Sequence, residues 1–126
     1  MRLLAITAVL IGAIIIYATF MFFHTGELSG ELLSDLHLIE QKVKDEQWKE
    51  ATREVEKLKK SWHKAEAWWT PSMDHRETEL IDMSIVRVAG WVDMRSKEDA
   101  LVEINVAKRM VQGIKEKESP SLKNIF

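Results

Sequence analysis

The sequence predicts an all-α protein in which an N-terminal transmembrane helix is followed by an antiparallel four-helix bundle made of two helical hairpins. Three observations lead to this prediction. Residues 3–23 carry no charged side chain. In residues 27–118, apolar side chains recur at steps of three and four, which is the helical period and not the strand period. The chain of 126 residues contains only 2 prolines, Pro71 and Pro120.

Residues 3–23 are the predicted membrane anchor. A helix of that length spans roughly 30 Å, the thickness of the hydrocarbon core of a bilayer. Aromatic residues gather toward its C-terminal end, and residues 24–27 mark the predicted exit into water. The alternative is a cleaved secretory signal. Such a signal has an apolar stretch of about 7 to 15 residues that ends in small residues, whereas bulky side chains fill residues 19–23 here.

The charges around the anchor predict its orientation. Arg2 and the α-amine precede the anchor, whereas residues 24–38 hold three acidic residues and no Lys or Arg. Positively charged flanks are retained in the cytoplasm. Residues 1–2 are therefore predicted to be cytoplasmic, and the rest of the chain beyond the anchor is predicted to be extracytoplasmic.

Small residues within the anchor permit self-association. Ala8 and Gly12 form a small-xxx-small pair, which lets two membrane helices approach closely. The alternative is that both residues simply face lipid. The predicted partners are therefore the lipid bilayer, a protein of the membrane or envelope, and a second copy of the chain.

The helices of the bundle are predicted from their ends and from their apolar faces. Asp45, Asp74 and Ser96 are predicted N-caps of the second, third and fourth helices. Pro71 separates the two hairpins. The predicted core-facing residues are Leu28, Leu32, Leu36, Ile39, Val43, Trp48, Ala51, Val55, Leu58, Trp62, Ala65, Ile81, Ile85, Val88, Val92, Leu101, Ile104, Ala107, Val111 and Ile114.

The two hairpins match each other when the chain is shifted by 49 residues. The matched apolar pairs are Leu32 and Ile81, Leu36 and Ile85, Ile39 and Val88, Val43 and Val92, Ala51 and Ala100, and Val55 and Ile104. Duplication explains this match, and so does the alignment of any two amphipathic hairpins of equal length. A bundle is preferred to a short helical-repeat stack because a solenoid generally needs three or more repeats.

Composition excludes several classes of function. Residues 27–126 hold 17 Lys and Arg against 20 Asp and Glu, so no basic surface for a nucleic acid is expected. The absence of Cys excludes disulfides, thiolate zinc sites and thiol nucleophiles. No nucleophile with a base, phosphate-binding loop or pair of catalytic carboxylates is recognised. We therefore expect no enzymatic activity and no cofactor.

One group of residues deserves testing as a metal site. His75 and Glu79 are four residues apart and share a helix face, Asp74 precedes them, and His63 lies across the hairpin turn. The alternative is that Asp74 caps a helix and that the negative charge of Glu79 is stabilised near the positive N-terminal end of that helix. His63 would then lie on a solvated face beside lysines. We favour the alternative.

Aromatic residues supply the candidates for binding a partner. Trp68 and Trp69 lie at one end of the first hairpin, where an exposed ring would suit a protein interface or a membrane surface. The alternative is that these rings belong to the core. The tail, residues 119–126, is predicted to pack on or near the bundle. The alternative is that Phe126 and its apolar neighbours dock into a partner.

The order of these features resembles domain-of-unknown-function family 4363. The features that carry the resemblance are the uncharged anchor, the acidic first helix, the DEQWKEA segment at 45–51, the segment from Trp62 to Trp69, His75 with nearby acids, and the SLKNIF ending at 121–126. The resemblance covers essentially the whole chain. It implies a small bacterial plasma-membrane protein with one membrane helix, and it implies nothing about mechanism.

The function that these observations predict is a membrane-anchored helical interaction module, an accessory or scaffold protein of the bacterial cell envelope. The alternative prediction is an extracytoplasmic domain that senses a ligand or a metal.

Overall fold

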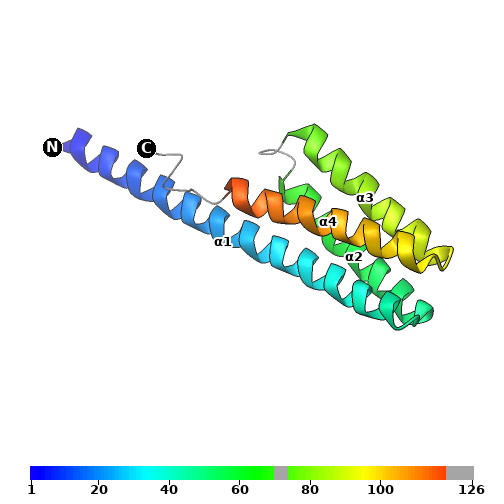
Figure 1. Ribbon diagram of the computed structural model, residues 1–126. Coiled ribbons are helices and arrows are strands. Elements are labelled where there is room, and N and C mark those ends of the chain that lie inside the picture. The colour runs from blue at the N-terminus through cyan, green and yellow to red at the C-terminus, as the bar shows by residue number, and fades with distance from the viewer. Residues whose placement is uncertain (70–73, 119–126) are drawn as a thin grey trace.

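The fold is all-helical, as predicted. The computed structural model describes residues 1–69 and 74–118, and within these ranges it contains four helices and no strand. They are α1 (Arg2–Lys44), α2 (Trp48–Trp69), α3 (His75–Asp93) and α4 (Lys97–Glu118). Figure 1 shows α2, α3 and α4 running alongside the second half of α1, while the first half of α1 projects beyond the bundle.

The predicted anchor and the first helix of the bundle form one continuous helix. Its 43 residues run through positions 24–27 without a break. The sequence predicted a boundary there because the side chains change from apolar to polar. That change does not interrupt the backbone, since no proline removes a helical hydrogen bond and an isolated glycine such as Gly26 costs a helix only about 1 kcal/mol. The predicted anchor therefore continues directly into the bundle.

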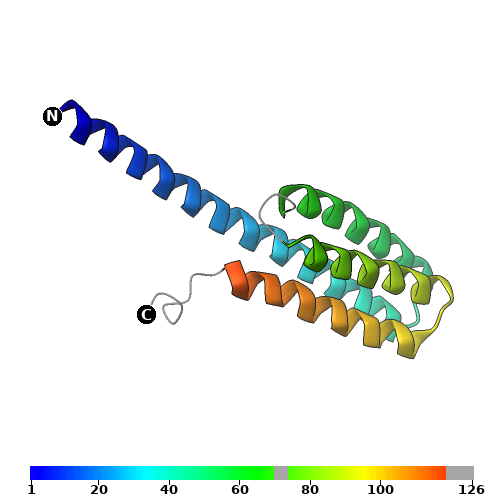
Figure 2. The same ribbon diagram turned by 90° about the horizontal axis from the view of Figure 1, so that it is seen from above.

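The helices form a closed ring. Helix α1 packs against α2 and α4, and α3 packs against the same two helices from the other side. Helices α1 and α3 therefore lie on a diagonal of the bundle. Short turns join α1 to α2 and α3 to α4, which makes each pair an antiparallel hairpin (Figure 2). The predicted bundle of two hairpins is confirmed.

The core agrees closely with the apolar pattern. All predicted core residues are buried except Trp48 and Leu101, which are half-buried and pack against the same core. Ala100 and Trp69 are the further buried members of the cluster. The side chains of one stripe from each helix thus meet in a single hydrophobic core.

One predicted helix cap is confirmed by its side-chain hydrogen bond, and a second residue lies at the predicted position. The Asp74 carboxylate accepts a hydrogen bond from the backbone N–H of Arg76 at 3.1 Å and begins α3. Ser96 directly precedes α4, and its hydroxyl donates to the Asp99 carboxylate. The prediction for Asp45 was wrong, because this residue ends α1 instead of starting α2. Two turn residues separate it from the first residue of α2.

The two hairpin turns have the same backbone hydrogen bonds. The N–H of Gln47 donates to the Lys42 carbonyl at 2.8 Å, and the N–H of Ser96 donates to the Trp91 carbonyl at 2.9 Å. These partners are related by the same 49-residue shift that aligns the apolar positions. The repeat seen in the sequence is therefore a repeat of structure.

Candidate functional site

The end of α2 packs against the last turn of the predicted anchor. The ring of Trp68 lies 4.2 Å from the ring of His24 and 6.1 Å from that of Phe20, in edge-to-face arrangements. Phe20 and His24 stack on each other with ring centroids 5.8 Å apart. The bundle therefore reaches the level at which residues 3–23 end. Trp68, a candidate for an exposed ring, is half-buried in this cluster.

Of the other two candidates for binding a partner, Trp69 lies within the described residues and is buried. Trp69 is 1% exposed and its ring lies 6.3 Å from that of Trp62. Trp69 therefore belongs to the core, the alternative that the sequence left open, because it continues the core face of α2. Phe126 and the tail, residues 119–126, lie outside the described residues.

The structure brings together two of the four candidate metal ligands. Nε2 of His75 lies 3.2 Å from a carboxylate oxygen of Glu79, and both side chains are exposed to solvent. Asp74 caps α3, and His63 is exposed on α2. Among the residues that the structure describes, no three His, Asp or Glu side chains are grouped so that they could hold a metal ion.

A polar side-chain contact links each pair of neighbouring helices in the ring. These links were not predicted, because the sequence pattern marks faces and does not say which polar residues meet. The contacts are Ser61 Oγ to Asp35 at 2.7 Å between α2 and α1, Trp62 Nε1 to Asp82 at 3.1 Å between α2 and α3, Ser84 Oγ and Arg87 Nε to one Glu103 oxygen at 3.0 and 2.8 Å between α3 and α4, and Lys108 Nζ to Glu40 at 2.8 Å between α4 and α1.

Asp35 is the most deeply buried acid of this set. It is 3% exposed. Burial raises the pKa of its carboxyl above the ordinary value of 3.8, because the ionised form loses water. The hydrogen bond from Ser61 and the charge of Lys57 act in the opposite direction, while Glu31 and Glu54 add to the increase. Ionisation of Asp35 therefore costs more in the folded protein than in water.

Glu40 has the opposite electrostatic environment. The hydrogen bond that Lys108 donates lowers the pKa of the Glu40 carboxyl, and the positive charges of Lys108 and Lys44 add to this effect against the cost of burial. The side chains of Glu40 and Lys108 are only 14% and 20% exposed. This ion pair therefore stabilises the contact between the first and last helices.

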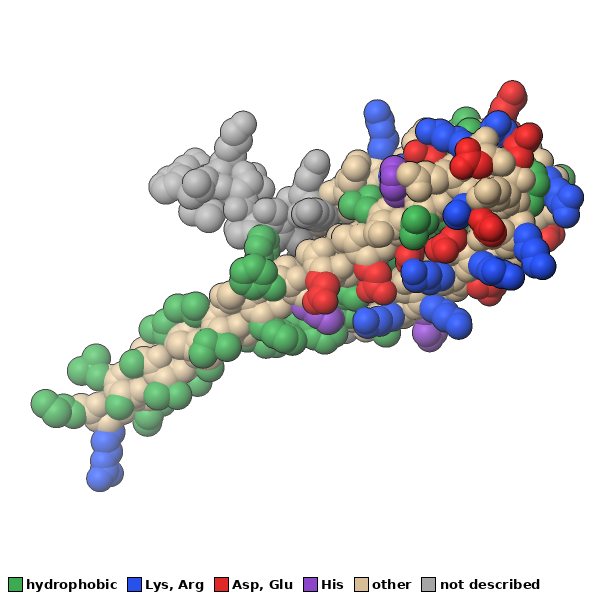
Figure 3. Space-filling view, turned by 90° about the horizontal axis from the view of Figure 1, so that it is seen from below, with side chains coloured by type: hydrophobic (Ala, Val, Ile, Leu, Met, Phe, Trp, Pro, Cys, Tyr) green, Lys and Arg blue, Asp and Glu red, His purple; other side chains and the backbone are tan. Residues whose placement is uncertain are grey.

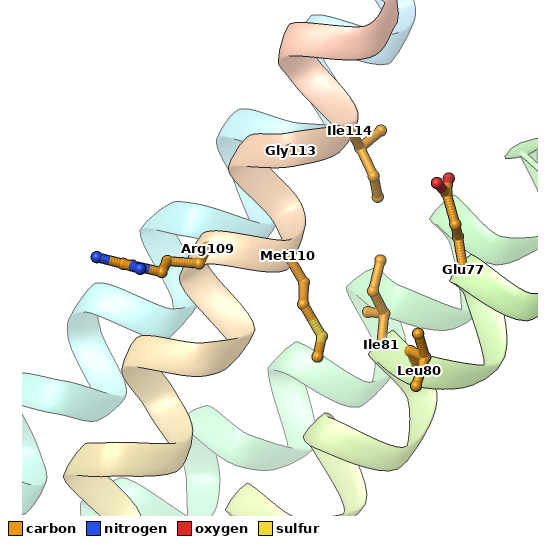
Figure 4. Close-up of a pocket in the computed structure, with 7 residues that line it drawn as sticks. All are labelled: Glu77, Leu80, Ile81, Arg109, Met110, Gly113 and Ile114. Carbon is orange, nitrogen blue, oxygen red and sulfur yellow. The ribbon is translucent and has the colours of Figure 1, made fainter.

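A shallow groove lies between α3 and α4 near the start of α3. Its volume is about 220 Å³. Leu80, Ile81, Met110 and Ile114 give it an apolar lining, and Figure 4 shows the guanidinium of Arg109 pointing away from it. Small-molecule sites generally enclose roughly 300 to 1,000 Å³. The groove is therefore small for such a site.

Helix α3 exposes a second set of apolar side chains on its outer face. The exposed fractions are 48% for Leu80, 52% for Met83 and 60% for Val86, and Met94 just after the helix is 71% exposed. Gly90, on the same face, is also exposed. At about 100° of rotation per residue these positions lie opposite the buried stripe of α3. We call these five residues the α3 stripe.

Comparison with known proteins identifies a family. No curated protein and no solved structure matches the chain. A family model matches residues 19–125, a range that begins in the last turns of the predicted anchor and includes the whole bundle. The chain thus belongs to the family described as Domain of unknown function (DUF4363).

Proposed function

We propose that the protein is a membrane-anchored helical interaction module, an accessory or scaffold protein of the bacterial cell envelope. The observation that carries this proposal is the first half of α1. Its most apolar window has a mean hydropathy of 2.5, and none of that window is buried within the chain. The helix is long and apolar enough to cross a membrane.

The energetics of exposed side chains support the anchor. Among them, Leu3, Val9 and Ile16 are 80%, 71% and 72% exposed. Leaving one such side chain in water instead of burying it costs about 1.5 to 3 kcal/mol. Figure 3 shows hydrophobic side chains covering the projecting half of α1 and charged side chains covering the bundle. A lipid bilayer would cover the apolar half of α1, and water would solvate the charged bundle.

The continuity of α1 supports a role in holding the bundle at the membrane. The helix passes from the apolar half into the bundle without a break. Trp68 packs on His24 and so fastens α2 to the same turn. In this proposal the domain stands upright at the bilayer, and the charges beside the anchor favour a cytoplasmic N-terminus and an extracytoplasmic bundle.

The alternative of a sensing domain gains one observation, which is the groove between α3 and α4. Its volume of about 220 Å³ is below the usual range for small-molecule sites. The metal form of this alternative required convergence of His63, Asp74, His75 and Glu79, of which His75 and Glu79 form a contact. We therefore place the interaction module first.

Membrane fractionation and cysteine labelling test the anchor and its orientation. The chain has no Cys, so a single introduced thiol reports one position. With Thr52→Cys, an exposed position on α2, we expect a membrane-impermeant maleimide to label intact cells. A cysteine inserted after Met1 should react only after the cells are permeabilised. Release of the chain by carbonate, or a mature chain that lacks residues 1–23, would contradict the anchor.

Co-purification tests the interaction role. After extraction of native membranes with a mild detergent, we expect the full chain to migrate with a partner protein or with a second copy of itself. A chain that migrates alone, even after chemical cross-linking in living cells, would contradict the proposal. The Asp35 and Glu40 contacts provide the control, since variants at these positions test stability without altering the exposed faces.

A further inference from the structure

We infer that the α3 stripe is the surface through which two copies of this chain associate side by side in the membrane. The inference rests on the proposed function, because it requires both copies to be anchored in the same orientation. Four observations support it: the contrast between the two hairpins, the apolar character of α3 on two faces, the direction of α3, and the charges beside the stripe.

The contrast between the hairpins shows that the stripe is not required by the fold. The 49-residue shift places Leu80 on Glu31, Met83 on Ser34, Val86 on His37, Gly90 on Gln41 and Met94 on Asp45. All five of these positions on the first hairpin are polar and exposed. The core positions remain apolar in both hairpins. A specific surface has therefore been added to the outside of α3.

Helix α3 is apolar on two opposite faces. Ile81, Ile85 and Val88 point into the core and are at most 4% exposed, whereas the α3 stripe faces solvent. A helix that is apolar on all sides is normally buried. Covering the exposed side chains would remove apolar surface from water, which is favourable by about 25 cal/mol per Å² buried. The outer face therefore favours association.

The direction of α3 indicates what covers it. Figures 1 and 2 show α3 running in roughly the same direction as α1, so in an anchored chain the α3 stripe runs along the membrane normal and not parallel to the bilayer surface. Two copies in one membrane point the same way. A rotation of 180° about the membrane normal brings the stripes of two chains together. Each residue then lies at the same height as the identical residue of the other chain. Confinement to one bilayer also raises the effective concentration, which favours a small interface.

The charges beside the stripe are self-complementary. Asp82 lies along the edge next to α2, where it accepts a hydrogen bond from Trp62. Arg87 lies along the edge next to α4, where it donates to a Glu103 oxygen. The two-fold rotation places the edge with Asp82 of one copy beside the edge with Arg87 of the other.

This dimer differs from one formed by the anchors. Helix α1 lies diagonally across the bundle from α3. With neighbouring helices about 10 Å apart, two copies joined through α3 hold their anchors roughly 40 Å apart. A dimer through Ala8 and Gly12 would instead place the anchors in contact. Positions on α3 and in the anchor therefore distinguish the two arrangements.

Single-cysteine cross-linking of the full chain in proteoliposomes tests the inference. We expect a short bifunctional maleimide to join Met83→Cys to its own copy, and Val86→Cys likewise. The controls are the equivalent positions on α1, Ser34→Cys and His37→Cys, where we expect at least tenfold less dimer. Equal yields at all four positions, or no dimer at Met83→Cys and Val86→Cys, would overturn the inference.

A second variant tests the interface without removing the reporter. In the Val86→Cys chain, Met83→Glu should lower the dimer yield about tenfold, whereas Ser34→Glu should leave it unchanged. Far-ultraviolet dichroism checks that both variants stay folded. If the dimer survives Met83→Glu but is lost with Gly12→Ile, the contact lies between anchors and the inference fails.

The same cysteines in native membranes separate this inference from the proposed function. Capture of a different protein at Met83→Cys, with no dimer, would overturn the second-copy inference and support the interaction module. If these cysteines capture no chain at all, the second-copy inference fails and the proposed function is unaffected. The membrane location is tested by fractionation, and its failure would remove the proposed function whatever the cross-linking yield.

Discussion

Glu46 and Arg95 occupy equivalent places in the two hairpin turns, with φ angles of 56° and 54°. They are the non-glycine residues with positive φ in the part of the chain that the structure describes. Each donates its N–H to the carbonyl three residues earlier, of Val43 and Val92 respectively, at 3.0 Å. Amphipathic spacing alone does not require this shared conformation. It therefore favours duplication of one hairpin over a chance alignment of two.

Glycine at either turn position should stabilise the protein. A side chain with a Cβ costs roughly 1 to 2 kcal/mol in the left-handed region, and glycine removes that cost while losing some entropy. We expect Glu46→Gly and Arg95→Gly each to raise the free energy of unfolding by about 0.5 to 1 kcal/mol. Chemical denaturation of the full chain in detergent measures this change.

The neighbouring turn residues provide the control for this prediction. Asp45 and Met94 have φ angles of −87° and −80°, which any residue adopts readily. Asp45→Gly and Met94→Gly should therefore lower stability, because glycine adds only flexibility to the unfolded chain. A fall in stability for Glu46→Gly equal to that for Asp45→Gly would show that the positive φ stores no strain.

The helices and the core were predictable because both depend on local spacing. The buried run from Leu28 to Val43 follows the helical period along the whole bundle half of α1. Trp69 was predictable too, since it lies seven residues after Trp62 on the same face, but its place beside the loop suggested an exposed tip. Continuity of α1 could not be predicted from a change of side-chain polarity, because polarity does not break a backbone.

The polar links were beyond sequence reasoning for a different reason. Ser61 and Asp35 are 26 residues apart, and their contact depends on the register of α2 against α1. The α3 stripe was visible in the sequence as Leu80, Met83 and Val86. Its exposure became clear only when the structure showed that α3 packs through its other face.

The buried Asp35 carboxyl should make stability fall from acid to neutral pH. Its pKa is raised in the folded state by burial, so the folded chain holds this proton to higher pH than the unfolded chain. The associated stability is present below pH 3.8, the ordinary value, and is lost as pH rises through the folded pKa. Asp35→Asn should remove this dependence and raise stability at pH 7 relative to pH 4.

Denaturation at pH 4 and pH 7 checks the prediction. Ser61→Ala should act in the opposite sense to Asp35→Asn, with a cost of about 1 to 3 kcal/mol at pH 7, because the ionised carboxylate loses its donor. Since both variants keep Glu40, its own titration cancels from the comparison. An unchanged pH dependence in Asp35→Asn would mean that Asp35 is equally solvated in both states.

Loss of Lys108 should destabilise the protein far more than loss of Lys59, the lysine at the equivalent position of the first hairpin. Lys108→Met leaves the largely buried Glu40 carboxylate without its main donor, so we expect a cost of about 3 kcal/mol. Lys59, equivalent by the 49-residue shift, pairs with Glu56 on an exposed surface. Lys59→Met should change the free energy of unfolding by less than about 0.5 kcal/mol.

The pH dependence of Lys108→Met gives an independent check. The pKa of Glu40 is lowered in the folded state, so its stabilisation is present above the ordinary value of 4.5 and is lost as pH falls through the folded pKa. The difference in stability between wild type and Lys108→Met should therefore shrink in acid. A difference that is constant with pH would assign the loss to packing of the lysine stem instead.

The two adjacent tryptophans at the end of α2 should behave differently. Trp69→Ala removes a fully buried ring and should cost about 3 to 5 kcal/mol. Trp68→Ala should cost less, because its ring is half-buried, but it should free the last turn of α2 from His24. Amide exchange at residues 65–69 should then become faster while exchange at residues 51–58 is unchanged. Equal exchange in both segments would argue against Trp68 as the fastening residue.

Gly30 and Gly90 offer the sharpest comparison between fold and interface. Both lie on exposed faces within helices, and a Cβ built on either would meet no atom within 4 Å. Gly30→Ala and Gly90→Ala should each raise the free energy of unfolding by about 0.5 to 1 kcal/mol, because alanine favours the helix.

Larger residues at these two positions should have different effects on the proposed interface. Gly90→Leu should retain the gain in helix propensity but hold two copies apart, so cross-linking through Val86→Cys should fall several-fold, whereas Gly30→Leu should leave it intact. Equal cross-linking in the two leucine variants would mean that the outer face of α3 does not closely approach another chain.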